Sequence, residues 1–170
     1  DLDQRRVGIP GVRTTAAKLL GHAAPTAQAV VVPFHGATQA IDAGTVDAAV
    51  LIHEGRLVYR QEGFHLVCDL GAWWDERHHL PLPLGGNVVR RALGADAIAR
   101  ASAMLREAIR YALTHRELAL DELLRAKVHM SRADADAYLG LYANQDTLDY
   151  GSDGRASVER LLEQTVDWAP

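Results

Sequence analysis

The sequence has 170 residues, of which 48% are hydrophobic and 24% charged, an ordinary composition for one soluble globular domain with a sizeable core. The net charge of −4, with 18 Lys and Arg residues in no basic stripe, argues against a nucleic-acid-binding protein. No apolar run reaches the roughly 20 residues of a membrane helix, and the single cysteine, Cys68, excludes an internal disulfide and indicates a reducing, cytoplasmic compartment.

The first part of the chain alternates strand and helix patterns. Short β-rich runs occupy residues 6–9 and 28–33, and helical spacing of small and apolar residues occupies residues 14–20 and 35–43. Gly44 follows the second helix, as expected for a residue just past a helix end. Because strands that alternate with helices build parallel sheets, this part of the chain is predicted to be an α/β lobe with a parallel or mixed sheet.

The lobe is organised around the next stretch, Thr45–Arg56. Its apolar residues follow one another without strict alternation up to Ile52, which is typical of a central parallel strand covered on both faces. The strand then ends in His53-Glu54-Gly55-Arg56. Ligands of open α/β sheets bind outside the carboxyl ends of the strands, so this position favours a functional role for His53. A histidine that only hydrogen-bonds a carbonyl at the edge of the core is the alternative.

The start of the first helix is a second candidate. The first N–H groups of a helix have no intrahelical partner, and they attract a carboxylate or phosphate together with the helix dipole. The alternative is that Thr14 or Thr15 simply caps the helix.

Past Arg56, residues 57–59 and 66–70 predict short strands, and Ala72–Glu76 predicts one or two helical turns. Neighbouring Trp73 and Trp74 cannot share one helical face, so one is expected to pack inward. His78-His79 has no third ligand at a recognisable spacing, and we therefore predict no metal site.

The proline-rich segment Leu80–Asn87 predicts an extended crossover. Amphipathic helix patterns then replace the strands, at residues 98–113, 118–128, 133–142 and 157–166. We therefore divide the chain into an α/β lobe, residues 1–95, and a helical region, residues 96–170, which either forms its own bundle or covers something outside this chain.

Several motifs, in this order along the chain, resemble the menaquinone-biosynthesis family of the futalosine pathway. They are Pro10-Gly11 with Thr14-Thr15-Ala16, Val46-Asp47-Ala48 leading to Ile52-His53-Glu54-Gly55-Arg56, Asp69-Leu70-Gly71 with Trp73-Trp74, and Leu80-Pro81-Leu82-Pro83-Leu84-Gly85-Gly86. Within this family the strand end at His53 is most similar to the 1,4-dihydroxy-6-naphthoate synthases. The sister chorismate dehydratases and a non-catalytic solute-binding module for small anions are the alternatives.

The resemblance implies a fold like the type II periplasmic binding proteins, with the ligand between two α/β lobes. It implies a carbon–carbon lyase that converts cyclic dehypoxanthine futalosine into 1,4-dihydroxy-6-naphthoate and dihydroxyacetone, without a metal or organic cofactor. His53 would be the general base, for which an ordinary imidazole pKa of about 6.5 is suited. Thr15 and Ala16 would hold an anionic or hydroxyl-bearing part of the substrate.

Members of this family also have an N-terminal lobe with a Ser-Pro-x-Pro-Asn-Asp stretch, which this sequence does not contain. We therefore expect residues 96–170 to pack on such a lobe and, where it is absent, to expose apolar surface. The expected partners are a small-molecule substrate and either that lobe or a second copy of the chain, but no nucleic acid and no membrane.

Overall fold

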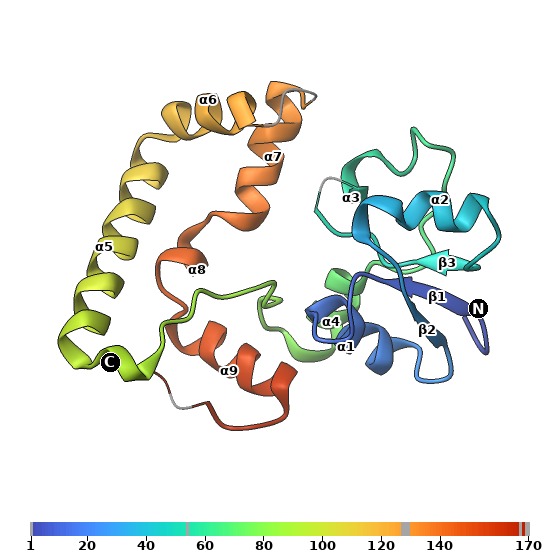
Figure 1. Ribbon diagram of the computed structural model, residues 1–170, viewed down its shortest axis with the longest axis horizontal. Helices are drawn as coiled ribbons and strands as arrows, with labels where there is room; N and C mark the ends of the chain where they lie inside the picture. The colour runs from blue at the N-terminus through green and yellow to red at the C-terminus, as the bar shows by residue number, and fades with distance from the viewer. Residues whose placement is uncertain (1, 54, 127–129, 167, 169–170) are drawn as a thin grey trace. The chain divides into compact units, whose positions relative to one another are not determined.

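The computed structural model describes residues 2–53, 55–126, 130–166 and 168. The chain divides into two compact units, Asp1–Leu82 and Pro83–Pro170 (Figure 1). The first unit contains the sheet and the second contains helices and short loops. Their boundary lies inside the proline-rich segment Leu80–Asn87.

The sheet of the first unit has three parallel strands in the order β2-β1-β3. The strands are β1 (Arg6–Ile9), β2 (Gln28–Val31) and β3 (Ala48–Ala49). Arg6 lies opposite Gln28, and Val7 lies opposite Ala48. The parallel α/β arrangement that the alternating pattern predicts is therefore confirmed.

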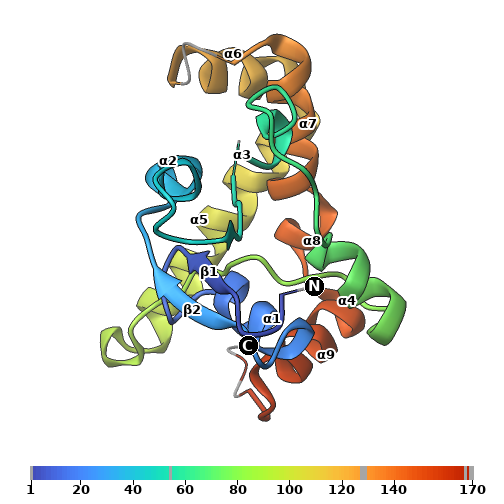
Figure 2. The same cartoon turned by 90° about the vertical axis from the view of Figure 1, so that its right-hand side faces the viewer.

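Helices cover both faces of the sheet, because alternate side chains of β1 point to opposite sides. Val7 and Ile9 pack with Leu20 of α1 (Thr15–Ala23) on one face. On the other face Val32 and Val46 pack with Ala37 of α2 (Ala37–Asp42). Both figures show α1 and α2 on opposite sides of the strands (Figures 1 and 2). Gly44 follows α2 with φ of 66°, as expected for a glycine past a helix end.

The prediction of a long central strand within residues 45–52 was wrong. β1 is the central strand, and β3 is a two-residue strand at an edge of the described sheet. Val46 is buried, with 1% of its surface exposed, but it packs against α2 before the strand begins, and the β3 residues themselves are only half-buried. Pairing reaches slightly further than β3, since the Val50 N–H donates to the Gly8 carbonyl at 2.8 Å.

Two further strand predictions in this unit were wrong. The Leu57–Tyr59 run begins in a helical turn, α3 (Gly55–Val58), in which the Tyr59 N–H donates to the Gly55 carbonyl. Residues 66–69 form no strand and the chain bends at Val67, while Leu66 and Val67 are exposed. An apolar run becomes a strand only where a neighbouring strand can pair with it.

The helix predicted around the two tryptophans is confirmed as α4 (Leu70–His78). Asp69 caps it by accepting hydrogen bonds from the N–H groups of Gly71 and Ala72. Trp74 is 2% exposed and Trp73 half-buried, so one of the pair does pack inward, and α4 contacts α1.

The second unit is helical throughout its described elements. They are a short 3₁₀ turn η2 (Arg91–Leu93) and the helices α5 (Ala95–Thr114), α6 (Arg116–Ala126), α7 (Arg132–Tyr142), α8 (Gln145–Leu148) and α9 (Gly151–Leu162). In Figure 1 the chain runs along α5, turns through α6 and returns through α7 and α8. None of these or the other described helices is long and apolar enough to cross a membrane.

Ion pairs between helices hold the return path of this unit. Arg116 contacts the Asp136 carboxylate at 2.7 Å, and Arg132 of α7 pairs with both Glu117 and Asp121 of α6. α5 has no buried residue, and Met104 is 74% exposed. The expected exposed apolar surface is therefore present, whereas the packing of residues 96–170 on another lobe stays a prediction.

Candidate functional site

The carboxyl ends of the three strands meet at one edge of the sheet, because all three strands are parallel. The segment after β1 leads to Thr15 and Ala16, the segment after β2 to Phe34 and His35, and the segment after β3 to His53. Topology therefore places all of the site residues expected from the sequence at the edge where α/β folds bind their ligands.

His53 makes the turn after β3 with an unusual backbone. Its φ is 52°, in the left-handed region, which non-glycine residues occupy in only a few per cent of cases. Such a conformation costs roughly 1–3 kcal/mol and persists only where the surrounding structure fixes it. The side chain is half-buried, with Nδ1 inside the protein. The backbone thus directs this imidazole at a cost in stability, as is common at functional sites.

Phe34 is the aromatic neighbour of His53. The two ring centroids lie 5.3 Å apart at an angle of 67°, an edge-to-face contact. The ring of the next residue, His35, also makes an edge-to-face contact with Phe34, with the ring centroids 5.5 Å apart. Phe34 begins the short turn η1 (Phe34–Gly36), three residues after the end of β2. The structure thus joins the segments that follow β2 and β3.

The start of α1 resolves which threonine caps the helix. Thr14 Oγ1 accepts a hydrogen bond from the Ala17 N–H at 3.1 Å and donates one to the Gly11 carbonyl at 2.7 Å. The first intrahelical bond runs from the Lys18 N–H to the Thr14 carbonyl. The backbone N–H groups of Thr15 and Ala16 therefore precede the first hydrogen bond of the helix ladder. N–H groups at this end of a helix can bind an anion. Ala16 is buried, so it would act through its backbone.

An ion pair fixes the start of β3 on β1. Asp47 Oδ1 lies 2.8 Å from Arg6 Nη2, and its Oδ2 accepts a hydrogen bond from the Arg6 backbone N–H at 2.9 Å. Arg6 also donates to the Gly44 carbonyl. The pKa of Asp47 is lowered from 3.8 to about 2. The largest cause is the hydrogen bond from the Arg6 side chain, and the next is the hydrogen bond from the Arg6 backbone N–H. We call this set of contacts between Arg6 and Asp47 the clamp. The clamp holds β3, the strand that leads to His53.

The other polar and aromatic residues named in the sequence analysis either pack within the first unit or lie outside the residues that the structure describes. Glu54, which follows His53 in the sequence, lies outside the described residues. Trp74 is buried and its ring lies 4.3 Å from the His78 ring, while Arg77 lies over Trp73. Packing of the helix explains both tryptophans.

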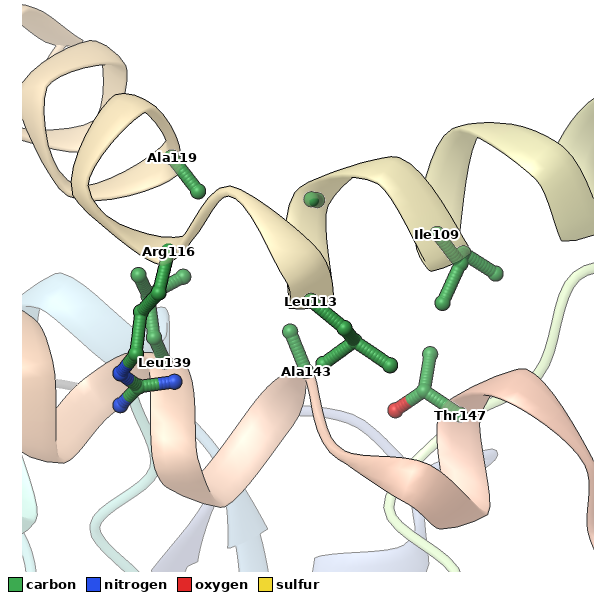
Figure 3. A pocket seen from close by; sticks show the side chains of 8 residues that line it. Ile109, Leu113, Arg116, Ala119, Leu139, Ala143 and Thr147 are labelled. Atoms are coloured by element: carbon green, nitrogen blue, oxygen red, sulfur yellow. The ribbon is translucent and has the colours of Figure 1, made fainter.

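The part of the chain that the structure describes contains no group of three or more His, Cys, Asp or Glu side chains that could hold a metal ion. A small pocket of about 80 Å³ lies in the second unit, lined mostly by apolar side chains (Figure 3). The lining residues are Ile109, Ala112, Leu113, Arg116, Ala119, Leu139, Ala143 and Thr147. It belongs to the packing of α5 to α8 and contains none of the predicted site residues.

A family model described as menaquinone biosynthesis matches residues 1–167. The chain belongs to the menaquinone biosynthesis family. Two relatives, both named 1,4-dihydroxy-6-naphthoate synthase, are each 38% identical to the chain: one from Streptomyces coelicolor over 98% of the chain and one from Thermus thermophilus over 96%. The chain spans 61% and 60% of their respective lengths.

A solved structure supports the same fold for this member of the menaquinone biosynthesis family. The crystal structure of protein AF1704 from Archaeoglobus fulgidus is 34% identical and matches 95% of the chain with a TM-score of 0.89. The match covers 61% of the Archaeoglobus chain.

Sequence reasoning missed Phe34. Its signal is its position, because it follows the end of β2 as His53 follows the end of β3. The contact between the two rings could not be read from the sequence, since it depends on the left-handed turn at His53.

Proposed function

We propose that the chain carries the catalytic base of a 1,4-dihydroxy-6-naphthoate synthase. The observation that carries this proposal is 38% identity to two proteins of that name over nearly the whole chain. The position of His53 at the carboxyl edge of the sheet, on a left-handed backbone, supports it. The reaction is carbon–carbon cleavage of cyclic dehypoxanthine futalosine, which gives 1,4-dihydroxy-6-naphthoate and dihydroxyacetone.

His53 is the general base in this proposal. A neutral imidazole accepts a proton from the substrate, and cleavage of the carbon–carbon bond releases the three-carbon product. Thr15 and Ala16 bind an anionic or hydroxyl-bearing part of the substrate at the start of α1, where the N–H groups and the helix dipole favour negative charge.

We further propose that the first unit is one lobe of a fold of the type II periplasmic-binding-protein kind. A parallel sheet of order β2-β1-β3 with helices on both faces is compatible with such a lobe. The ligand would then bind at the carboxyl edge of this sheet and meet a second lobe on its other side. The helical second unit would pack on that second lobe through its exposed apolar residues.

The test measures release of dihydroxynaphthoate by mass spectrometry. The chain is incubated with cyclic dehypoxanthine futalosine, first alone and then as a chimera in which it replaces the matching segment of the Thermus thermophilus relative. We expect the chimera to form product. A chimera that folds and binds the substrate but forms no product would contradict the proposal and favour a solute-binding module.

The role of His53 is tested in the active form. His53→Ala should lower kcat by about 10²- to 10⁴-fold, because a positioned base contributes that much to a rate. Affinity for the substrate should change little. His22→Ala is the matched control, since His22 lies in the last turn of α1 and faces solvent. Turnover near the unmodified rate in His53→Ala would refute the assignment.

A further inference from the structure

The ring of Phe34 is half-exposed beside His53. Its side chain is 49% exposed, although the ring is large and apolar. A phenylalanine whose purpose is to fill a core is normally buried. The described core of this unit on the α2 side is built from Val32, Ala37 and Val46 and does not include Phe34. Burial therefore does not account for the position of the Phe34 ring.

The backbone that carries Phe34 is well anchored. Val32 is buried, and its N–H donates to the Ile9 carbonyl at 3.0 Å, so the chain stays attached to β1 up to the residue before Pro33. The next residue along the chain is Pro33, whose ring fixes its own φ angle. The Pro33 carbonyl accepts a hydrogen bond from the Gly36 N–H at 2.9 Å. The ring is thus attached to a fixed part of the sheet edge.

Two imidazole rings, those of His35 and His53, contact the ring of Phe34. His53 lies 5.3 Å from Phe34 between ring centroids, at 67°, and His35 lies 5.5 Å away, at 82°. Edge-to-face pairs at such distances are attractive and have a preferred orientation. The contact with His53 links the segment after β2 to the segment after β3, and neither strand pairs with the other. It therefore sets the position of one segment against the other.

A general base must be held in a defined orientation to act. Small displacements of a catalytic group cost rate, and about 1 Å can cost roughly 10²-fold. The backbone of His53 is left-handed, which fixes the direction in which its side chain leaves the chain. Rotation about the side-chain bonds also decides the orientation of the imidazole, and the Phe34 ring lies where it can restrict this rotation.

We propose that Phe34 is a positioning residue, whose ring holds the imidazole of His53 in the orientation needed for proton transfer. This inference rests on the proposed function, because it assigns Phe34 to the same site. Phe34 acts through His53 and need not touch the substrate. It restricts the imidazole by edge-to-face contact from a rigid neighbouring segment.

The first test is independent of catalysis and uses NMR on the isotopically labelled full chain. The ring C–H signals of His53 are assigned by their loss in His53→Gln. We expect nuclear Overhauser effects between these protons and the Phe34 ring, and a shift of the His53 signals in Phe34→Leu as the ring current is removed. Phe64→Leu is the matched control, because Phe64 is the only other phenylalanine of the chain.

The second test measures kinetics in the form that turns over, either the chain alone or the chimera. Phe34→Leu should lower kcat about 10- to 100-fold, with KM changed less than about two-fold. Phe34→Tyr, which keeps the ring, should retain a kcat near that of the unmodified protein. Phe64→Leu should leave both constants unchanged. A merely structural role would not produce this separation of kcat from KM or the rescue by tyrosine.

The two tests together decide the proposal. Unchanged His53 signals in Phe34→Leu would overturn it, as would shifted signals with an unchanged kcat. If the chimera folds and binds the substrate but does not turn it over, the proposed function fails and the catalytic role of Phe34 fails with it. The NMR result would then still show whether Phe34 orients His53, so the two failures are distinguishable.

Discussion

Gly8, in the middle of the central strand, offers a sharp test of the packing of the sheet. A Cβ atom at this position would lie 2.9 Å from Val32 Cγ2 and 3.2 Å from the Ala49 Cβ. Carbon atoms in favourable contact are about 3.5–4.0 Å apart, so both neighbours would have to move. Val32 is buried and Ala49 belongs to β3, so neither moves without disturbing the sheet.

We therefore expect Gly8→Ala to lower the free energy of unfolding. Overpacking costs about 1–3 kcal/mol, and the smaller backbone entropy of alanine in the unfolded chain returns about 0.5–1 kcal/mol. The net loss is then up to about 2.5 kcal/mol, and about 1 kcal/mol at the midpoints of the two ranges. Gly21→Ala is the control, because Gly21 lies in α1 and no described atom is within 4 Å of its would-be Cβ. That change should stabilise the protein by about 0.5–1 kcal/mol.

The assay is urea unfolding followed by tryptophan fluorescence in a Trp168→Phe background. The remaining tryptophans, Trp73 and Trp74, both belong to the first unit and report its unfolding. If Gly8→Ala is stabilised as much as Gly21→Ala, the close packing between β1 and its neighbours is refuted, because only the entropy gain would then remain.

Two further predictions concern the clamp and the helix start. Asp47→Asn should destabilise the first unit, and its pH dependence follows from the lowered pKa of Asp47. The folded-state pKa of about 2 lies below the ordinary 3.8, so the carboxylate stabilises the fold at pH values above about 4 and loses this contribution as the pH falls toward 2. Thermal unfolding of both proteins at pH 6 and pH 3 should therefore show a smaller difference at pH 3, and equal differences would contradict the clamp. Thr15→Val should raise the substrate Kd by about 2- to 10-fold, the effect of losing one hydrogen bond, in a calorimetric titration of the active form. Thr14→Ala should instead lower stability by about 1 kcal/mol through loss of the cap, and an unchanged Kd in Thr15→Val would assign Thr15 to the helix alone.

Elements with strong local signals could be predicted from the sequence. β1 has the predicted bounds, and the first helix and α7 begin and end close to their predicted positions. In the two helices the periodicity of the apolar residues and the capping residues, Thr14 and Ser131, agree with each other. The third strand was predicted as central because its apolar residues do not alternate, but a helix covers part of this run and β1 takes the centre. Whether an apolar residue packs against a strand or a helix depends on distant parts of the chain.

The candidate site shows the same division. The position of His53 after a strand could be predicted, because parallel strands end at one edge. The capping role of Thr14, the left-handed turn at His53 and its contact with Phe34 required the structure. These features depend on backbone angles and on segments brought together by the sheet, which leave no periodic pattern in the sequence.

The central position of β1 has a consequence for the order of folding. β1 and β2 are joined by α1 alone, whereas the clamp between Arg6 and Asp47 closes over 41 residues. Closing the longer loop costs more chain entropy, so the β1–β2 pair is expected to form before β3 docks. Until then His53 has no fixed place beside Phe34. The candidate base thus arrives with the last strand, and an incompletely folded chain can have most of its sheet without having a site.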